Sequence, residues 1–513
     1  MKKTAFIVIS ITVISKILGF LREIVFSYFY GASAFSDAYL ISISIPNLLF
    51  SFVAAGISTA FIPIYNDICQ RKSEKAANLF TNNLINIIIL LTTFVVFLVF
   101  FFTEETVGIF AKGFTGETLE LAIYFTRVSI FGIYATLLYN LYSSFLRIKN
   151  DCATPSFAGF PLNVITIISI VISAKTNKYF LTWGSTIAIF SQLILILLSS
   201  YKKGYKYKLF LNFKDKNIGN LFLLSMPIIL SSSINSLNMM IDRTIASEVA
   251  KGGISALNYA TRLNGFVQGL FVVTIVTIMF PEISKKASNN NFEGIKKTVA
   301  ESIILILLAV VPASLGLLIF PDEIVSLLFA RGAFDSNALS MTSSALFYYS
   351  LGMFATAMTE ILARVFYAMK DTVTPVKNSL IAIVINIVLN IVLSKYMGIG
   401  GLALATSIAG VVAMILMFYS FRKKFGHFGF LTVFKETIKM FIAALLMAII
   451  AKSSYKLFLT KLGANASLII AILIAVIFYS FLVILFKVKE VNNIINGIKR
   501  RLILTKSQVN ISE

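Results

Sequence analysis

The sequence predicts an all-α polytopic membrane protein with about fourteen transmembrane helices, and its composition supports this fold class first. Hydrophobic residues make up 58% of the 513 residues and charged residues only 13%, and the mean hydropathy is +0.87. A water-soluble chain of this size needs more polar surface to cover its core. Helices of about 20 apolar residues each would use most of the apolar residues, which leaves no room for a large soluble catalytic domain.

The second observation is a series of apolar segments bounded by charged residues, Gly or Pro, each long enough for a membrane span. The first six are residues 5–21, 38–64, 84–102, 121–142, 157–174 and 180–200. The next six are residues 218–241, 255–280, 299–320, 338–366, 378–394 and 399–420. Two more follow at 434–452 and 466–487.

The N-terminus has two interpretations. Met1–Lys3 and the apolar run that follows resemble a signal peptide, and Ala32–Ala34 resembles a cleavage site. Lys16, Arg22 and Glu23 interrupt the run, however, which favours a retained first span.

The net charge of +22 is concentrated in short segments between the apolar runs. One such loop contains Lys202, Lys203, Lys206, Lys208, Lys214 and Lys216, and another contains Arg422, Lys423 and Lys424. Basic loops of this kind are typical of segments that face the cytoplasm and its anionic leaflet, so a nucleic-acid partner is the weaker interpretation. With an even number of spans, this asymmetry predicts that both termini are cytoplasmic.

Several kinds of chemistry are excluded or disfavoured. Cys69, Cys152 and the single His427 are too few for a Cys₄ zinc site and disfavour other metal or disulfide frameworks. The chain has no Walker loop, so ATP is not the expected energy source. We expect no enzyme activity, and ion gradients, the membrane potential or downhill flow remain as driving forces.

The third observation is an internal repeat. Asp, Thr and Pro of the segment 151–155 recur 220 positions later in 371–375, and Tyr39 and Tyr259 share this offset. Six spans in each copy bring both copies into the membrane from the same side, which predicts parallel repeats that form an N-lobe and a C-lobe around a central cavity. The expected segments are the N-lobe 1–200, a basic linker 201–217, the C-lobe 218–420, a basic loop 421–433, two additional spans 434–487 and a basic tail 488–513.

Polar side chains lie on one face of several expected helices. In the first span they are Thr12, Ser15, Lys16, Gly19, Arg22 and Glu23, and in the eighth they are Asn258, Thr261, Arg262, Gly265, Gln268 and Gly269, with identical spacing. The second span adds Asp37, Ser44, Asn47 and Ser51 on a similar face. A helix that faces only lipid would not carry such a face.

A charge at the bilayer centre costs at least about 2.5 to 3.5 kcal/mol, so a buried Lys or Arg faces water, a counter-ion or a substrate, or snorkels to the interface. For Arg364, the spacing from Glu360 favours an ion pair within one helix, and snorkelling suffices for Arg127. Two cationic faces that meet at a cavity predict an anionic ligand, a phosphate or pyrophosphate. The predicted binding residues are Lys16, Arg22, Arg262, Asp37, Ser15 and Asn47.

A second set of polar residues has the chemistry of a sodium site. Asp242 ends the polar seventh span, Asn386 and Asn390 lie one turn apart on the eleventh, and Thr406 lies on the twelfth. Oxygen ligands with a single carboxylate suit a hard monovalent cation. Asn and Thr also serve as ordinary hydrogen-bonding contacts between helices, and this alternative stays open.

Several motifs resemble those of the MurJ (MviN) lipid II flippases, which belong to the multidrug/oligosaccharidyl-lipid/polysaccharide exporter superfamily. They are Ser15–Glu23, Ser36–Tyr39, Ile45–Leu49, Ala60–Pro63, Asn258–Leu263, Leu328–Phe334 and Phe366–Pro375, which extend over most of the chain. The resemblance implies an inner-membrane transporter that carries undecaprenyl-pyrophosphate-linked peptidoglycan precursor to the outer leaflet by alternating access. It further implies that the lipid is the main partner and that a monomer is functional.

The resemblance places Arg22, Asp37 and Arg262 at functional cavity positions of the family. Lys16 stands where an arginine is common, and Phe50-Ser51 replaces a stretch that often carries arginine. It also implies that Asp242, Asn386, Asn390 and Thr406 match a sodium site, with Asn390 neutral where a carboxylate occurs. 

Alternative functions are a flippase for another polyprenyl-linked glycan, a drug/cation antiporter, a membrane glycosyltransferase or ligase, and a scaffold that binds the lipid carrier. Cationic stripes disfavour a cationic drug, and short external loops disfavour the membrane enzyme.

Overall fold

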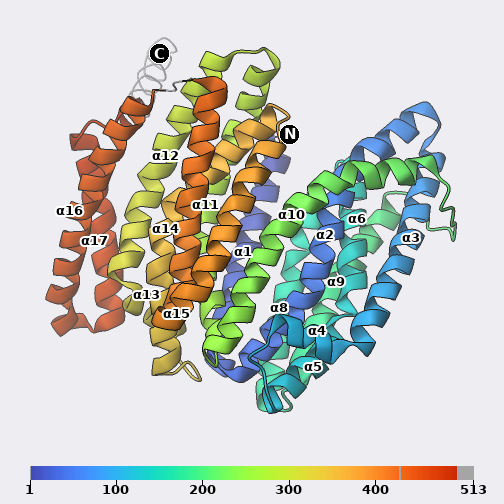
Figure 1. Ribbon diagram of the computed structural model, residues 1–513, viewed down its shortest axis with the longest axis horizontal. Coiled ribbons are helices and arrows are strands. Elements are labelled where there is room, and N and C mark those ends of the chain that lie inside the picture. Colours follow the sequence, from blue (N-terminus) through green and yellow to red (C-terminus); the bar gives the residue numbers. More distant parts are fainter. Residues whose placement is uncertain (1, 427–428, 494–513) are drawn as a thin grey trace, which may run out of the picture. The chain divides into compact units, whose positions relative to one another are not determined.

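The computed structural model describes residues 2–426 and 429–493, apart from the side chains of residues 2–7, 9, 50–55, 58–59, 227–228, 230–232, 234–235 and 430. All regular elements within these ranges are helices (Figure 1). The first ten are α1 (Lys2–Tyr30), α2 (Ala34–Arg71), α3 (Glu74–Phe101), α4 (Thr103–Phe110), α5 (Glu117–Ser129), α6 (Gly132–Ile148), α7 (Ala153–Phe157), α8 (Gly159–Lys175), α9 (Phe180–Lys202) and α10 (Lys216–Val249). The others are α11 (Gly253–Ser288), α12 (Phe292–Ile319), α13 (Pro321–Phe329), α14 (Ser336–Ala368), α15 (Val373–Phe425), α16 (Phe430–Leu462) and α17 (Ala464–Leu485).

The all-α fold class is confirmed, and every expected span coincides with a helix or a helix pair. The expected spans 378–394 and 399–420 lie in α15, which is broken at Gly398, where φ is +57° and ψ is −135°. The span 121–142 is divided between α5 and α6, which are bent by 41°. By length and composition, the described part of the chain has eight helices able to cross a membrane, or up to nine if each bent pair is one span.

The chain forms two compact units. Unit 1 contains residues 1–256 and 329–338, and unit 2 contains residues 257–328 and 339–513. Unit 1 therefore includes α10, although the expected second copy of the repeat begins within that helix, at residue 218. Packing and gene duplication are different properties, so the expected lobe boundaries stay a prediction.

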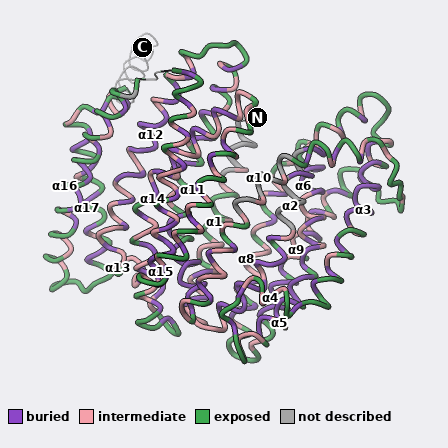
Figure 2. The backbone as a smooth tube through the Cα atoms, viewed as in Figure 1, coloured by how far each residue is buried: buried purple, intermediate pink, exposed green. Residues whose placement is uncertain are grey.

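In unit 1, α2 is the central helix and packs against α3, α5, α6 and α10, while α8 packs against α1 and α9. Buried and exposed residues alternate along the helices (Figure 2). The hydrophobic core of this unit includes Phe61, Tyr65, Phe80, Phe145 and Tyr205, all of which are buried. Phe61 of α2 stacks on Phe80 of α3, and Tyr65 of α2 packs edge-on against Phe145 of α6. These ring contacts hold α2 against both helices.

In unit 2, α16 packs against α12 and α17. The Tyr479 hydroxyl on α17 donates to the carbonyl of Leu308 on α12 at 3.0 Å. Within the same unit, Gly352 of α14 permits close packing on α15, because a Cβ there would lie 2.6 Å from the Cα of Ser407. The additional helices α16 and α17 are thus fixed to unit 2 by specific contacts.

The two copies of the sequence repeat have the same local structure at one turn. Asp151 accepts hydrogen bonds from Thr154 N at 3.0 Å and Thr154 Oγ1 at 2.8 Å, and Asp371 accepts from Thr374 N at 3.1 Å and Thr374 Oγ1 at 2.9 Å. The preceding residues, Asn150 and Lys370, have φ of 59° and 60°. These equal geometries support the duplication.

Candidate substrate-binding residues

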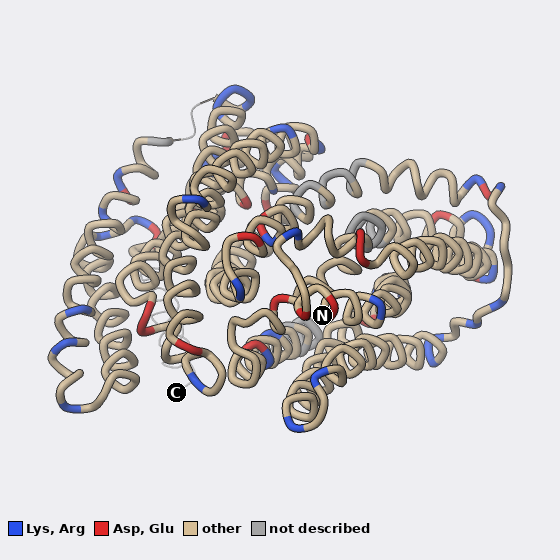
Figure 3. The backbone as a smooth tube through the Cα atoms, turned by 60° about the horizontal axis from the view of Figure 1, so that its bottom comes forward, with Lys and Arg blue, Asp and Glu red and all other residues tan. Residues whose placement is uncertain are grey.

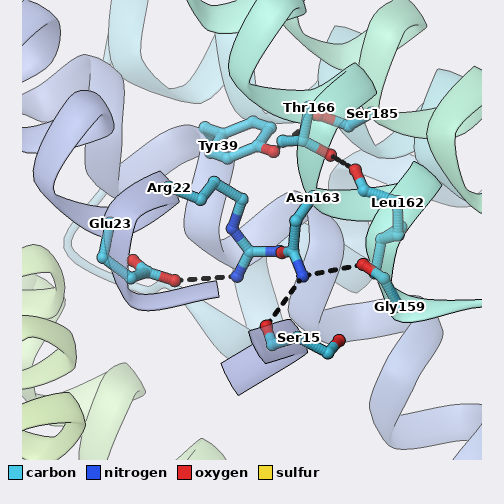
Figure 4. A network of polar contacts seen from close by, with 9 residues as sticks. All are labelled: Ser15, Arg22, Glu23, Tyr39, Gly159, Leu162, Asn163, Thr166 and Ser185. Carbon is cyan, nitrogen blue, oxygen red and sulfur yellow. Dashed lines mark hydrogen bonds and ion pairs between the residues drawn. The ribbon is translucent and has the colours of Figure 1, made fainter. Parts of the chain in front are cut away.

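The side chain of Arg22 on α1 lies between an acid and an amide (Figure 4). Its Nη1 donates to Oδ1 of Asn163 on α8 at 3.2 Å, and its Nη2 donates to Oε1 of Glu23 at 2.8 Å. Glu23 is buried, whereas 25% of the Arg22 side chain is exposed. Internal pairing is therefore present in this conformation, and it holds the guanidinium in one orientation with part of its surface open.

Asn163 was not among the predicted binding residues, although it orients Arg22. Its Nδ2 donates to the carbonyl of Gly159 at 2.8 Å and to the carbonyl of Ser15 at 3.4 Å. A Cβ on Gly159 would lie 2.2 Å from Ser15 Oγ, so glycine permits α8 to approach α1 this closely. In the sequence, a single Asn within an apolar run is typical of an ordinary contact between helices, which is why the pattern does not reveal this role.

Two further predicted residues of unit 1 are accessible. Lys16 is exposed on α1, and Asn47 is exposed on α2, where it lines a small pocket with Pro46, Ser129 and Thr136. The side chains of Phe50 and Ser51 lie outside the described residues.

Asp37 differs from Arg22 because its side chain is almost fully buried. It is 1% exposed, and its Oδ2 accepts from the backbone N–H of Gly252 at 2.8 Å. Its Oδ1 accepts from Ser255 N at 2.8 Å and from Ser255 Oγ at 2.6 Å. A carboxylate that accepts these N–H groups caps the first turn of α11 and complements the helix dipole. In this conformation the first turn of α11 covers Asp37, so its geometry supports a positioning role, while contact with a substrate stays a prediction.

The turns near Asp37 interlock through glycines. A Cβ on Gly332 would lie 2.2 Å from the carbonyl oxygen of Tyr28, and a Cβ on Gly113 would lie 2.0 Å from that of Ser247. The two carbonyl residues, Tyr28 and Ser247, are 219 positions apart in the sequence, and so are the two glycines, Gly113 and Gly332. The same glycine-to-carbonyl contact therefore occurs twice, in repeat-related form. The N–H of Ala333 also donates to the Tyr28 carbonyl at 2.8 Å. We call these four turns, at residues 28–37, 111–116, 247–255 and 330–335, the turn interlock.

Arg262 belongs to unit 2, where α11 also presents a row of polar residues. Arg262 is exposed, and Asn258, one turn earlier, is buried. Gln268 donates to Asn264 Oδ1 at 3.0 Å and to Thr356 Oγ1 at 2.8 Å, which ties this face of α11 to α14. The polar face predicted for the eighth span thus has one exposed cation and several internal contacts.

The residues predicted for sodium lie in different units. Asp242 is buried in unit 1, and Asn386, Asn390 and Thr406 lie on α15 in unit 2. Asn390 Nδ2 donates to Asn386 Oδ1 at 2.9 Å, and Asn386 Nδ2 donates to Thr406 Oγ1 at 3.2 Å. The donor chemistry fits a hard cation, but in this conformation amide hydrogens occupy two of the oxygens. The described residues contain no group of three or more His, Cys, Asp or Glu that could hold a metal ion.

Two other cations have local partners. Arg364 Nη2 lies 2.6 Å from Glu360 Oε1 on the same helix, as the spacing predicts. Arg127 contacts Thr103 at 3.4 Å and the ring of Phe100 at 5.8 Å. Most other Lys and Arg residues lie near helix ends and in connecting turns (Figure 3).

Long apolar helices that carry charged clusters within them indicate a multi-span membrane protein. The same fold occurs in an inward-facing multidrug resistance transporter of the MATE family and the MOP superfamily, with a TM-score of 0.69, 16% identity and coverage of 83% of this chain and 98% of the other. A solved structure titled lipid II flippase MurJ, inward closed conformation, matches with a TM-score of 0.78 and 27% identity, and covers 93% of this chain and 98% of that one.

Sequence comparison gives the family. The family described as lipid II flippase MurJ matches residues 26–487. A relative from Buchnera aphidicola subsp. Schizaphis graminum, named "Probable lipid II flippase MurJ", is 31% identical, with 87% of each chain covered. The chain belongs to the lipid II flippase MurJ family, and as such it is a transporter and not an enzyme.

Proposed function

We propose that this chain carries lipid II, the undecaprenyl-pyrophosphate-linked peptidoglycan precursor, from the cytoplasmic to the outer leaflet of the bacterial cytoplasmic membrane. Family membership supports the substrate class. The observation within the structure that carries the proposal is the half-buried Arg22, which Glu23 and Asn163 hold within an apolar helix. A guanidinium suits a pyrophosphate because its fork donates to two oxygens at once.

Each predicted binding residue has its own part in this proposal. Arg22 and Lys16 contact the pyrophosphate from α1, and Arg262 contacts it from α11. Ser15 and Asn47 supply hydrogen bonds to the head group, and Asp37 holds the first turn of α11. The lipid tail stays in the bilayer, so no covalent step is required.

Alternating access would open and close the turn interlock. The expected topology puts these four turns on the external side, with both termini in the cytoplasm. Two repeat-related glycine contacts and the Asp37 cap support the view that these turns are held together within unit 1. We further propose that the functional unit is a monomer.

Sodium binding by Asp242, Asn386, Asn390 and Thr406 is a separate proposal. The buried amides of α15 and their mutual bonds support a site that changes its hydrogen bonds when an ion enters. Sodium, but not potassium at equal ionic strength, should raise the unfolding temperature of the purified protein. Asn390→Leu should abolish that difference, and equal effects of both salts on the unaltered chain would contradict the proposal.

The experiment that tests the main proposal uses bacteria depleted of their own lipid II flippase. We expect the unaltered chain to restore growth and outer-leaflet lipid II, and Arg22→Gln and Arg262→Ala to fail although they insert normally. Arg127→Gln is the matched control, because Arg127 lies near a helix end, where its side chain contacts Thr103 and the ring of Phe100. If a well-inserted unaltered chain restores neither growth nor lipid II, the carried lipid is another polyprenyl-linked glycan, and Phe50-Ser51 is the first place to examine.

A further inference from the structure

The segment between α9 and α10 is anchored by asparagines of α3. Residues 205–212 have no helical structure, and we call residues 205–214 the linker strap. Asn83 bonds twice to Asn212: its Nδ2 donates to the carbonyl at 2.8 Å, and its Oδ1 accepts from the N–H at 2.6 Å. Asn86 Nδ2 donates to the carbonyl of Phe210 at 2.9 Å.

Two tyrosines of the linker strap return to the same asparagines. The Tyr207 hydroxyl donates to Asn86 Oδ1 at 2.6 Å, and the Tyr205 hydroxyl donates to Asn82 Oδ1. Tyr205 is buried against Tyr142 and Phe145 of α6. The strap is therefore held in a defined conformation, because side chains of α3 form hydrogen bonds with several of its backbone groups.

The outer side of the linker strap combines exposed apolar residues with lysines. Leu209 is 85% exposed and Phe213 is 66% exposed. Lys206, Lys208 and Lys214 are exposed beside them, and the segment from 201 to 217 contains a single acid, Asp215, which caps α10 instead.

This combination fits the surface of a membrane better than water or the bilayer core. Non-helical backbone outside a barrel does not occur in contact with hydrocarbon, where unpaired N–H and C=O groups are costly. Apolar side chains at such exposure are unfavourable in water alone. Alternating basic and apolar groups are typical of segments that lie at the interface of an anionic leaflet.

We propose that the linker strap binds anionic phospholipid head groups, with Lys206, Lys208 and Lys214 at the phosphates and with Leu209 and Phe213 at the acyl boundary. Bound lipid would hold the strap, and the end of α3 that carries it, at one depth of the membrane. The proposal rests on the membrane location of the chain and does not depend on which lipid the chain transports.

The test places a fluorescent probe on the strap. Trp183 is the single tryptophan, so Leu209→Trp in a Trp183→Phe background gives one emitter at the proposed site. The full chain is reconstituted in vesicles that contain either brominated phosphatidylglycerol or brominated phosphatidylcholine at the same fraction. We expect brominated phosphatidylglycerol to quench the probe at least about twofold more strongly, and we expect this preference to fall as salt rises.

Matched charge variants identify the source of the preference. Lys206→Gln/Lys208→Gln/Lys214→Gln should bring the quenching ratio close to one, whereas Lys452→Gln/Lys456→Gln/Lys461→Gln, with the same loss of charge on α16, should leave it unchanged. Single Lys→Gln variants of the strap should give intermediate ratios if the triple variant does not fold. Equal quenching by both lipids would overturn the proposal, and so would absence of quenching or a preference that survives the triple strap variant.

Discussion

At the scale of single residues, hydrogen-bond geometry separates two predicted site residues of similar appearance in the sequence. Arg22 and Asp37 are both ionisable residues at or near apolar spans. Arg22 keeps part of its surface exposed while Asn163 and Glu23 orient it, whereas Asp37 is covered by the first turn of α11. We therefore expect changes at Arg22 to affect transport and changes at Asp37 to affect the stability of the turn interlock.

Arg22→Lys tests whether the fork of the guanidinium matters. Lysine keeps the charge but donates from a single nitrogen, so it cannot bridge Asn163 and Glu23 in the same way. We expect transport to fall by about tenfold, the equivalent of losing one charged hydrogen bond of roughly 1.5 kcal/mol. Outer-leaflet lipid II in flippase-depleted cells measures the effect, and Arg127→Lys is the control. Unchanged transport by Arg22→Lys would show that charge alone suffices.

Asp37→Ala tests the cap of α11. It leaves the buried N–H groups of Gly252 and Ser255 without their acceptor, which costs about 1 to 3 kcal/mol. Chemical unfolding of the purified protein measures this loss. Asp67→Ala is the matched control, since Asp67 is half exposed and pairs only with exposed Arg71, a contact worth less than about 1 kcal/mol. Equal losses in the two variants would contradict the assigned cap.

At the scale of elements, helices were predictable and their small connections were not. Each apolar run of the sequence became a helix, because a backbone in lipid must satisfy its own hydrogen bonds. The short helices α4 and α13, of 8 and 9 residues, lie between the spans and have no long apolar run to announce them. The asparagines of α3 at positions 82, 83 and 86 were visible in the sequence, but their partners lie more than 120 positions away.

Asn83→Ala tests how the linker strap is held. It removes both bonds to the backbone of Asn212, so we expect the strap to detach more often and its peptide bonds to become accessible. Limited trypsin digestion after Lys206 and Lys208 should become several-fold faster, with a matching rise in hydrogen exchange of 205–212. The control is Asn465→Ala at the exposed start of α17. Cleavage at the same rate in Asn83→Ala and the unaltered chain would contradict the clamp.

The hydrogen-bonded turn at Asp371, just before α15, predicts a dependence on pH. Burial pushes the pKa of Asp371 upward, but hydrogen bonds from Lys424 and Thr374 outweigh it, so the pKa lies below its usual value. A carboxyl with a lowered pKa stabilises the fold above its unfolded pKa of about 3.9, and this stability is lost as the pH falls through the lower, folded pKa.

Asp371→Asn should therefore lower the unfolding temperature at pH 7 and reduce its decline on acidification from about pH 5 to pH 3. Asp322→Asn, at an exposed position of α13, should follow the unaltered chain. A decline of equal steepness in Asp371→Asn and the unaltered chain would show that this carboxyl is not a source of acid sensitivity.

At the scale of the whole molecule, the repeat could be recognised in the sequence, but the contacts that its two copies form could not. The offset of 220 predicted a duplication, and the turns at Asp151 and Asp371, which this offset relates, have the same hydrogen bonds. The same duplication also produced the paired glycine contacts of the turn interlock. Those contacts join residues that are far apart in the chain. In a sequence, the only sign of two closely packed backbones is a glycine, and glycines occur for many other reasons.

We propose that this chain transports its lipid by opening the turn interlock, and one cross-linking measurement tests this most directly. Tyr28→Cys/Ala333→Cys, in a background with Cys69→Ser and Cys152→Ser, joins two turns whose backbones are hydrogen-bonded at 2.8 Å. In flippase-depleted cells that rely on this variant, oxidation should stop the supply of outer-leaflet lipid II, and a reducing agent should restore it. The control with Tyr28→Cys alone should transport under both conditions. Continued transport by fully cross-linked protein would contradict the account.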